Sequence, residues 1–355
     1  MCLYPKLIKN KKYLPNKKNG GDVPIAKDER VLYVPVGCGR CFECRRQKRR
    51  EWQVRLTEDI KINNKCLFVT FSFSEQSLDL LEKEIKWDKS YYIRCNEIAR
   101  LAVRRFLERW RKKYKKSIRH WLVTELGQNN TERVHLHGLL WTEESKDIIE
   151  HIWMYGNIWV GDYVNERTIN YIVKYLSKSD GIHKNYVPKM FVSKGIGSGY
   201  INSVNAKRNV FKDDNTNETY VNRKGFKFGL PVYYRNKLYN DNEREHLWLN
   251  KLDEEVRYVD GVKIDISDNE EEYLQVREEA RAKNLRLGYG TDETGRDEKE
   301  YMKRIRYVKH LTNEVKQIKK EEIKFVEVPK FNNFENVIDT INKYDILNIF
   351  KDFKL

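Results

Sequence analysis

The strongest constraint on the fold is an alternation of strand-like and helix-like patterns between residues 67 and 178. It begins with residues 67–73, LFVTFSF, where β-branched and aromatic side chains indicate a buried strand. Apolar residues then recur at helical spacing, in a helix that Asn96 can cap and that runs to about Lys116. A strand followed by an amphipathic helix predicts a sheet with a helix packed on it.

Further elements complete this pattern. Two strands are joined by the polar loop Gly127–Thr131, which is typical of a hairpin, and a helix, a short strand and a last helix follow. Their predicted ranges are 118–125, 133–141, 144–155, 158–160 and 166–178. The order β-α-β-β-α-β-α predicts an α+β fold with a central antiparallel sheet flanked by helices.

Changes of composition divide the chain into four expected parts. These are a basic, cysteine-rich N-terminal segment with a helix over 42–60, the sheet domain, a glycine-containing extension, and a charged, partly helical C-terminal region ending in Phe334–Leu355. Their boundaries are 1–64, 65–185, 186–245 and 246–355.

The chain is strongly basic, with 69 Lys and Arg against 53 acidic residues and a formal charge of +16. Such a field attracts polyanions, so nucleic acid is the expected partner, although a basic protein without that role can have the same balance. The densest cationic surface lies on the N-terminal helix and could follow DNA phosphates or simply be solvated. Its residues are Arg45, Arg46, Lys48, Arg49 and Arg50.

The cysteines indicate a reducing compartment. The sequence has neither an apolar run of about 18 residues nor a signal peptide, so we expect a cytosolic protein without a membrane partner. Cys38, Cys41 and Cys44 are spaced Cys-x2-Cys-x2-Cys, and Cys2 could be a fourth thiolate. Four thiolates could hold a structural Zn²⁺, while iron–sulfur ligation and unliganded thiols are the alternatives.

A pair of histidines marks a candidate metal site. His135 and His137 lie two residues apart on a predicted strand, so both imidazoles project from one face. Glu125 ends the preceding strand, and the hairpin can bring its carboxylate beside them. Two histidines and a carboxylate leave open positions for a substrate oxygen, which fits Mg²⁺ or Mn²⁺, with Zn²⁺ as an alternative. The competing interpretation is a pair of half-buried histidines with ordinary hydrogen-bond partners.

Two tyrosines are the candidate nucleophiles. Tyr171, Lys174, Tyr175 and Lys178 follow one another at helical spacing and would share one stripe of the last helix. Phenols and ammonium groups together on one stripe suit attack on a phosphodiester, whereas tyrosines that merely cover the sheet edge are the alternative. Because a phenol titrates near ~10, a lysine or a metal must help it to act as a nucleophile.

Together the two groups predict cleavage of DNA by transesterification. The metal would polarise a non-bridging phosphate oxygen, and Tyr171 or Tyr175 would attack phosphorus. The 3′-hydroxyl would leave and the 5′ end would stay on the tyrosine, so that the step can be reversed to join ends. A second tyrosine one turn away could attack a second strand.

These residues resemble the HUH endonuclease superfamily. His135-Leu136-His137 is similar to its histidine–hydrophobic–histidine motif, Glu125 to its acidic ligand, and the strand Phe68–Phe73 to its first motif. Both tyrosines with their lysines resemble its Tyr-x-x-Lys motif, as in the two-tyrosine branch. The blocks Met1–Pro5, Val34–Cys41 and Leu230–Tyr234 are similar to replication initiation proteins of the gokushovirus group of Microviridae.

The resemblance implies an HUH fold, a relative of the RRM and ferredoxin-like folds, and a function in rolling-circle replication. It implies nicking of single-stranded DNA at a phage origin, synthesis by a host helicase and DNA polymerase in the bacterial cytoplasm, and religation of the genome.

Two other function classes fit parts of the sequence. A non-catalytic nucleic-acid-binding protein would use the basic helix and a zinc knuckle, and its tyrosines would be dispensable. A metal-dependent hydrolase would use Glu125, His135 and His137 with water and would leave no covalent adduct.

Overall fold

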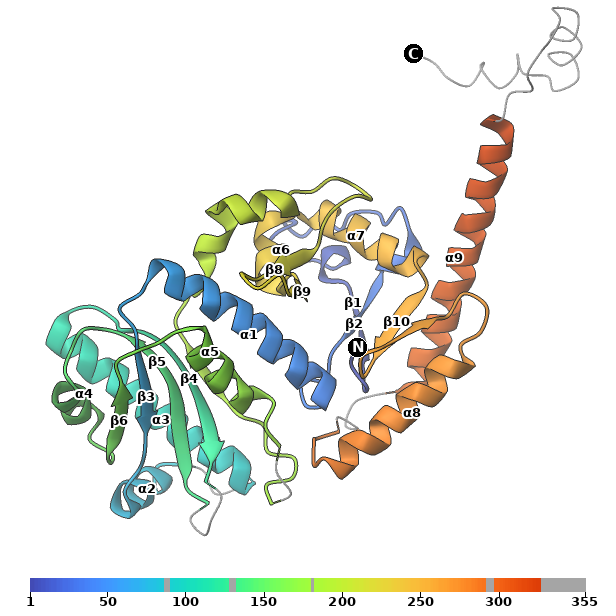
Figure 1. Cartoon of the computed structure of the whole chain (residues 1–355). Coiled ribbons are helices and arrows are strands. Elements are labelled where there is room, and N and C mark those ends of the chain that lie inside the picture. The colour runs from blue at the N-terminus through green and yellow to red at the C-terminus, as the bar shows by residue number, and fades with distance from the viewer. Residues whose placement is uncertain (86–89, 128–131, 180–181, 292–296, 327–355) are drawn as a thin grey trace, which may run out of the picture. The chain divides into compact units, whose positions relative to one another are not determined.

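The computed structural model describes residues 1–85, 90–127, 132–179, 182–291 and 297–326 (Figure 1). The chain divides into two compact units, Met1–Tyr301 and Met302–Leu355. The second unit is described as far as Val326 and holds most of helix α9 (Glu298–Val326). The predicted loop residues 128–131 and the segment Phe334–Leu355 lie outside the described residues. No helix in the described ranges has the length and apolar character that a membrane span needs.

The first unit is built on a five-stranded sheet in the order β6-β3-β5-β4-β7, in which every neighbouring pair is antiparallel. Its strands are β3 (Leu67–Phe71), β4 (Arg119–Leu126), β5 (Val134–Trp141), β6 (Ile158–Gly161) and β7 (Met190–Val192). The predicted α+β fold with an antiparallel sheet flanked by helices is confirmed. The short edge strand β7 is an addition, because its three residues are too few to show a period.

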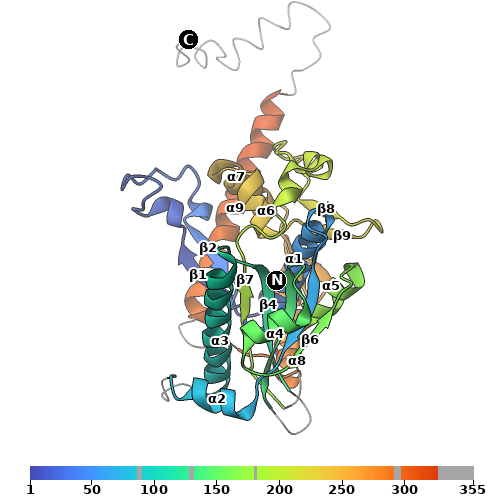
Figure 2. The same cartoon turned by 90° about the vertical axis from the view of Figure 1, so that its left-hand side faces the viewer.

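One face of the sheet is covered by helices α3 (Tyr91–Tyr114) and α4 (Lys146–Trp153), with α2 (Glu75–Glu82) against α3 (Figures 1 and 2). Phe71 of the sheet stacks on Trp153 at 4.5 Å between ring centroids and packs on Phe106 at 5.4 Å. Burial of large aromatic side chains of this kind dominates the energetics of a core.

Helix α3 begins earlier than predicted. Ser90, and not Asn96, is its N-cap residue, so the predicted capping role of Asn96 is wrong. The amide of Asn96 is used between elements instead. It accepts a hydrogen bond from Thr124 at 2.8 Å and donates one to the Val187 carbonyl at 3.0 Å. A side chain that caps a helix in many proteins here ties α3 to the sheet.

The other face is covered by helices α1 (Phe42–Ile62) and α5 (Glu166–Ile172) and by a 3₁₀ turn, η3 (Val173–Leu176). Trp52 of α1 packs on Trp121 of β4 with 5.9 Å between ring centroids. The continuous helix predicted over 166–178 is therefore wrong, because it ends in a 3₁₀ turn. A 3₁₀ turn has 3.0 residues per turn against 3.6 in an α-helix, so it redirects the side chains that follow.

The rest of the first unit consists of hairpins, helices and 3₁₀ turns that extend this layer. The two-stranded sheets are β1 (Lys6–Lys9) with β2 (Tyr33–Val36), β8 (Thr219–Val221) with β9 (Lys227–Gly229), and β10 (Val256–Val259) with β11 (Val262–Asp265). The helices are α6 (Val232–Leu238), α7 (Asp241–Asp253) and α8 (Glu271–Arg286). The 3₁₀ turns are η1 (Lys11–Tyr13), η2 (Glu29–Val31), η4 (Ser198–Asn202) and η5 (Val204–Asn209). The four-part division of the chain stays a prediction.

Candidate active site

Strand register brings the two histidines and the acid together. Glu125 on β4 lies directly opposite His135 on β5, and His137 lies opposite Thr70 on β3. Directly opposed residues in an antiparallel pair point to the same face. All four side chains therefore share the face that α1 and α5 cover.

His137 is held at both ring nitrogens. Its Nδ1 lies 3.0 Å from the Thr70 hydroxyl, and its Nε2 lies 2.8 Å from Oε2 of Glu125. A carboxylate can only accept, so Nε2 carries the hydrogen, and in the neutral ring Nδ1 accepts from Thr70. This pair of contacts fixes the orientation of the ring.

Glu125 is the charged centre of the group. Its second oxygen, Oε1, pairs with the ammonium of Lys178. Burial by itself would raise the pKa of this carboxyl, but the hydrogen bonds from His137 and Lys178 outweigh it, and the pKa lies below its ordinary value. Next to it, burial lowers the pKa of His135, and the neighbouring ring of His137 lowers it further. The site thus holds an ionised carboxylate beside a neutral imidazole at neutral pH.

The tyrosines lie against this group. The ring of Tyr175 stacks on His137 with 4.2 Å between centroids and 5° between planes. Its hydroxyl donates to the hydroxyl oxygen of Tyr171 at 2.9 Å. Tyr175 is 8% exposed, whereas Tyr171 is 50% exposed. Burial raises the pKa of Tyr175, and its contact with Tyr171 raises it further, so Tyr175 stays protonated as a hydrogen-bond donor.

The lysines separate from each other. Lys178 reaches Glu125, but Lys174 is exposed, and its side chain makes no hydrogen bond or ion pair with a described residue. The single stripe predicted for the four residues is therefore wrong, because the 3₁₀ turn between Tyr171 and Lys178 changes the spacing.

The donor set fits a divalent cation in its chemistry. Two imidazoles and a carboxylate are suitable ligands, and the Thr70 contact is of the kind that orients a ligating histidine. A cavity of about 20 Å³ lies beside Glu125, Tyr175 and Lys178, enough for one water-sized group. The three ligand atoms do not, however, all lie within 4.8 Å of one another, and Lys178 already neutralises Glu125. The spacing of the donors would therefore have to tighten around an ion.

The basic helix does not present all its cations to solvent. Arg45 is 2% exposed and donates to the backbone carbonyls of Leu176, Tyr186 and Lys178 at 3.0, 3.1 and 2.7 Å. It therefore does not lie on the cationic surface that the sequence predicted for DNA. Of the others, Arg46 pairs with Asp260, Lys48 and Arg49 are half-buried, and Arg50 is exposed.

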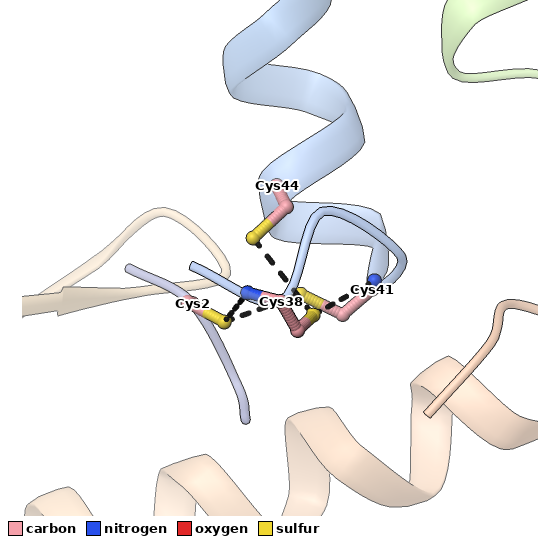
Figure 3. A group of neighbouring side chains, drawn as sticks. All are labelled: Cys2, Cys38, Cys41 and Cys44. Carbon is pink, nitrogen blue, oxygen red and sulfur yellow. Dashed lines mark hydrogen bonds between the residues drawn. The ribbon is translucent and has the colours of Figure 1, made fainter. Parts of the chain in front are cut away.

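Figure 3 shows that the four cysteines predicted as thiolates converge. The sulfurs of Cys2, Cys38, Cys41 and Cys44 all lie within 4.8 Å of one another. The Sγ–Sγ distance is 3.9 Å from Cys2 to Cys41 and 4.0 Å from Cys38 to Cys44. A tetrahedral site with Zn–S bonds of about 2.3 Å has edges of about 3.8 Å, so the group could hold such a metal ion.

Backbone amides support these sulfurs. The Cys38 amide donates to Cys2 Sγ at 3.2 Å, and the Cys41 amide donates to Cys38 Sγ at 3.3 Å (Figure 3). Gly39, with φ of +74°, turns the chain between these ligands, a conformation that favours glycine. Cys66 and Cys95 lie apart from the group and are buried, and burial raises the pKa of the Cys66 thiol.

Comparison with known proteins agrees with the position of this site. Residues 66–180 match the model of a family of replication-associated proteins, the ORF2 family. No curated protein and no solved structure matches the chain significantly. The matched range contains Glu125, both histidines and both tyrosines. The match suggests a role in replication initiation and, with it, nucleic-acid binding.

Two residues near the site were missed by the sequence reasoning. Thr70, which contacts His137, lies in a strand predicted only as core. Tyr289 lies far along the chain, and its hydroxyl donates to the Ser177 carbonyl at 2.5 Å. A signal for Thr70 would have been its opposition to His137, which requires the sheet order. Nothing local to Tyr289 indicates its contact.

Proposed function

We propose that this chain is a replication initiation protein that nicks and rejoins single-stranded DNA through a tyrosine, for rolling-circle replication of a single-stranded DNA phage. The proposal includes an HUH-type site and activity in the cytoplasm of a bacterial host, with a host helicase and DNA polymerase. The observation that carries it is the stacking of Tyr175 on His137, with the Tyr175 hydroxyl bonded to Tyr171. The family match over the same residues supports the role in replication.

We assign the first attack to Tyr171. It is half exposed, so a phosphodiester can reach its oxygen, whereas Tyr175 is buried. The hydrogen bond from Tyr175 leaves the proton of Tyr171 directed elsewhere and stabilises negative charge on its oxygen. Tyr175 would become a second nucleophile only after the first ring moves.

The reaction is balanced as a transesterification. The Tyr171 oxygen forms a bond to phosphorus while the bond from phosphorus to the 3′-oxygen breaks. The phenol releases one proton and the departing 3′-oxygen gains one. The 5′ end stays on the tyrosine, and attack by a 3′-hydroxyl reverses both bond changes. Lys174, exposed on the same segment, can hold a phosphate oxygen of the bound strand.

Glu125, His135 and His137 would hold Mg²⁺ or Mn²⁺, which would supply charge stabilisation at a non-bridging phosphate oxygen. In this arrangement Thr70 orients His137, and Lys178 is a mobile counter-cation for Glu125. Arg45 and Tyr289 hold the carbonyls of the segment that follows Tyr175.

The test uses labelled single-stranded oligonucleotides that tile the replicon encoding the protein, incubated with Mn²⁺. Wild type should form a covalent adduct on a denaturing gel, at Tyr171 by peptide mapping. Tyr171→Phe should lower the initial rate by roughly 10³-fold or more, because the nucleophile is lost. Tyr175→Phe should lower it only about three- to tenfold, the value of one hydrogen bond.

Each competing function gives another result. Cleavage without an adduct would indicate a hydrolase that uses water. Binding without cleavage would indicate a non-catalytic nucleic-acid-binding protein. An undiminished adduct in the Tyr171→Phe, Tyr175→Phe double variant would remove the assignment of both tyrosines.

We also propose that the four clustered cysteines hold one structural Zn²⁺. The support is the near-tetrahedral spacing of the sulfurs and the amide donors to Cys2 and Cys38. Iron bound at this place in the purified protein would contradict zinc.

A further inference from the structure

A groove of about 670 Å³ lies on the side of the molecule that α1 and α5 occupy, where the β8–β9 hairpin meets them. The groove is basic: Lys61, Arg167, Arg223 and Lys224 line it, and Glu166 is the one acid among its described lining residues. Lys61 pairs with Glu58. The other cations have no carboxylate partner within the described part of the chain. An excess of unpaired positive charge in a concave surface favours a polyanionic ligand.

The tip of the hairpin is ordered by its own side chains. Asn222 Oδ1 accepts hydrogen bonds from the amides of Lys224 and Phe226 at 3.0 and 2.9 Å. Gly225 takes a φ of +80° within this turn. The turn thus presents Arg223, Lys224 and the ring of Phe226, which is 63% exposed. An exposed aromatic beside cations suits a ligand that has both flat bases and phosphates.

The hairpin is anchored below the groove. Tyr220 is 3% exposed, and its hydroxyl donates to Oε1 of Glu58 on α1. The backbone of the hairpin accepts from the amide of Asn209, at 2.9 Å to the Thr219 carbonyl. This anchoring fixes the cations of the tip against α1, so the groove is present before a ligand binds.

The groove continues toward the tyrosine pair. Gln53 of α1 donates to Asn170 of α5 at 2.7 Å, and both line the groove. Asn170 directly precedes Tyr171 in the same helix. A strand lying in the groove would therefore pass the helix that presents the nucleophile.

We propose that this groove binds single-stranded DNA next to the cleavage site, with Arg223 and Lys224 on phosphates and Phe226 stacked on an unpaired base. The inference rests on the proposed function and names the path of its substrate. Single strands are favoured over duplex because paired bases do not expose their faces to Phe226. The amides of Gln53 and Asn170 can meet base edges, since both groups donate and accept.

The test measures anisotropy of a fluorescein-labelled single-stranded DNA of about 16 nucleotides over a salt series, with the full chain. In Arg223→Gln/Lys224→Gln, the slope of log K against log salt should fall by about 1.4, at about 0.7 for each single-strand phosphate contact. Phe226→Ala should raise the Kd about tenfold at each salt concentration. Duplex of the same sequence should be insensitive to Phe226→Ala.

The matched control is Arg111→Gln/Lys112→Gln. It removes the same charge from exposed positions on α3, which covers the opposite face of the sheet. Equal slopes in the two double variants, or an unchanged Kd in Phe226→Ala, would overturn the proposal. Tighter and equally Phe226-dependent binding of the RNA counterpart would overturn its assignment to DNA.

Adduct formation at saturating DNA separates this inference from the proposed function. Groove variants that bind normally while wild type forms the adduct would refute the groove alone. Absence of an adduct in wild type, with groove-dependent binding intact, would refute the tyrosine chemistry alone. Unchanged thermal unfolding of each variant shows that it is folded.

Discussion

At the scale of single residues, Glu125 couples the strands to the tyrosine segment, since one carboxylate oxygen meets His137 and the other meets Lys178. Glu125→Gln keeps the size of the side chain and removes its charge. We expect the variant to lose about 1–3 kcal/mol of unfolding free energy at pH 7, the value of hydrogen bonds to a charged group. Urea unfolding in the presence of a chelator measures this without a contribution from bound cations.

The pH dependence gives this prediction its sign. The pKa of Glu125 is lower in the folded protein than its unfolded value of about 4.3, so the folded state favours the ionised form. The stabilisation is therefore complete above the unfolded pKa and is lost as pH falls through the folded pKa. Wild type and Glu125→Gln should converge in that acidic window. A difference that stays constant through it would show that the charge of Glu125 does not contribute.

Single residues also show what the sequence could indicate. The placement of His135 and His137 on one face follows from the period of two in a strand, and the sheet register agrees. The partner of each nitrogen does not follow from spacing. Thr70 reaches His137 only because β3 lies next to β5 in the sheet, which is a property of topology.

At the scale of elements, the start of α1 holds the end of the tyrosine segment. Arg45 donates to the carbonyls of Leu176 and Lys178, on either side of Ser177. Arg45→Met would leave buried carbonyls without their donors, and we expect a loss of about 3 kcal/mol in stability. Amide hydrogen exchange over residues 173–178 should accelerate, because the segment loses its anchor.

Arg50→Met is the matched control, because Arg50 is an exposed cation on the same helix. It should change stability by no more than about 0.5 kcal/mol. If Arg45→Met had equally small effects on stability and exchange, the carbonyl contacts would not hold the segment. A slower adduct reaction in Arg45→Met, with unchanged affinity for DNA, would support its role in positioning Tyr171.

The same element explains an error of the sequence reasoning. Residues 166–178 have no Gly or Pro, so the apolar spacing predicts one helix. In the structure α5 stops at Ile172, and the carbonyls near Ser177 accept from Arg45 and Tyr289 instead of continuing a helix. Both donors belong to parts of the chain more than a hundred residues away in sequence. Local propensity could not include them.

At the scale of the whole molecule, the cysteine cluster joins segments that are distant in the sequence. Cys2 comes from the N-terminal segment, and the other three come from the loop and first turn that open α1. The apolar cluster around them includes residues of the β10–β11 hairpin and of α8. The spacing of the cysteines in the sequence indicated the ligands, but not this connection between the two ends of the first unit.

Removal of the metal should therefore loosen one part of the first unit and leave the sheet. We expect wild type to hold about one zinc and Cys41→Ser to lose it. Stability should fall by about 3–4 kcal/mol, as for an ion present at 100 to 1,000 times its Kd. Exchange should accelerate over residues 1–5 and 38–46, while β4 and β5, buried between two helical layers, stay protected. Cys66→Ser removes a buried thiol outside the cluster and should keep the zinc. Equal zinc loss in both variants, or uniform exchange across the first unit, would contradict a local structural ion.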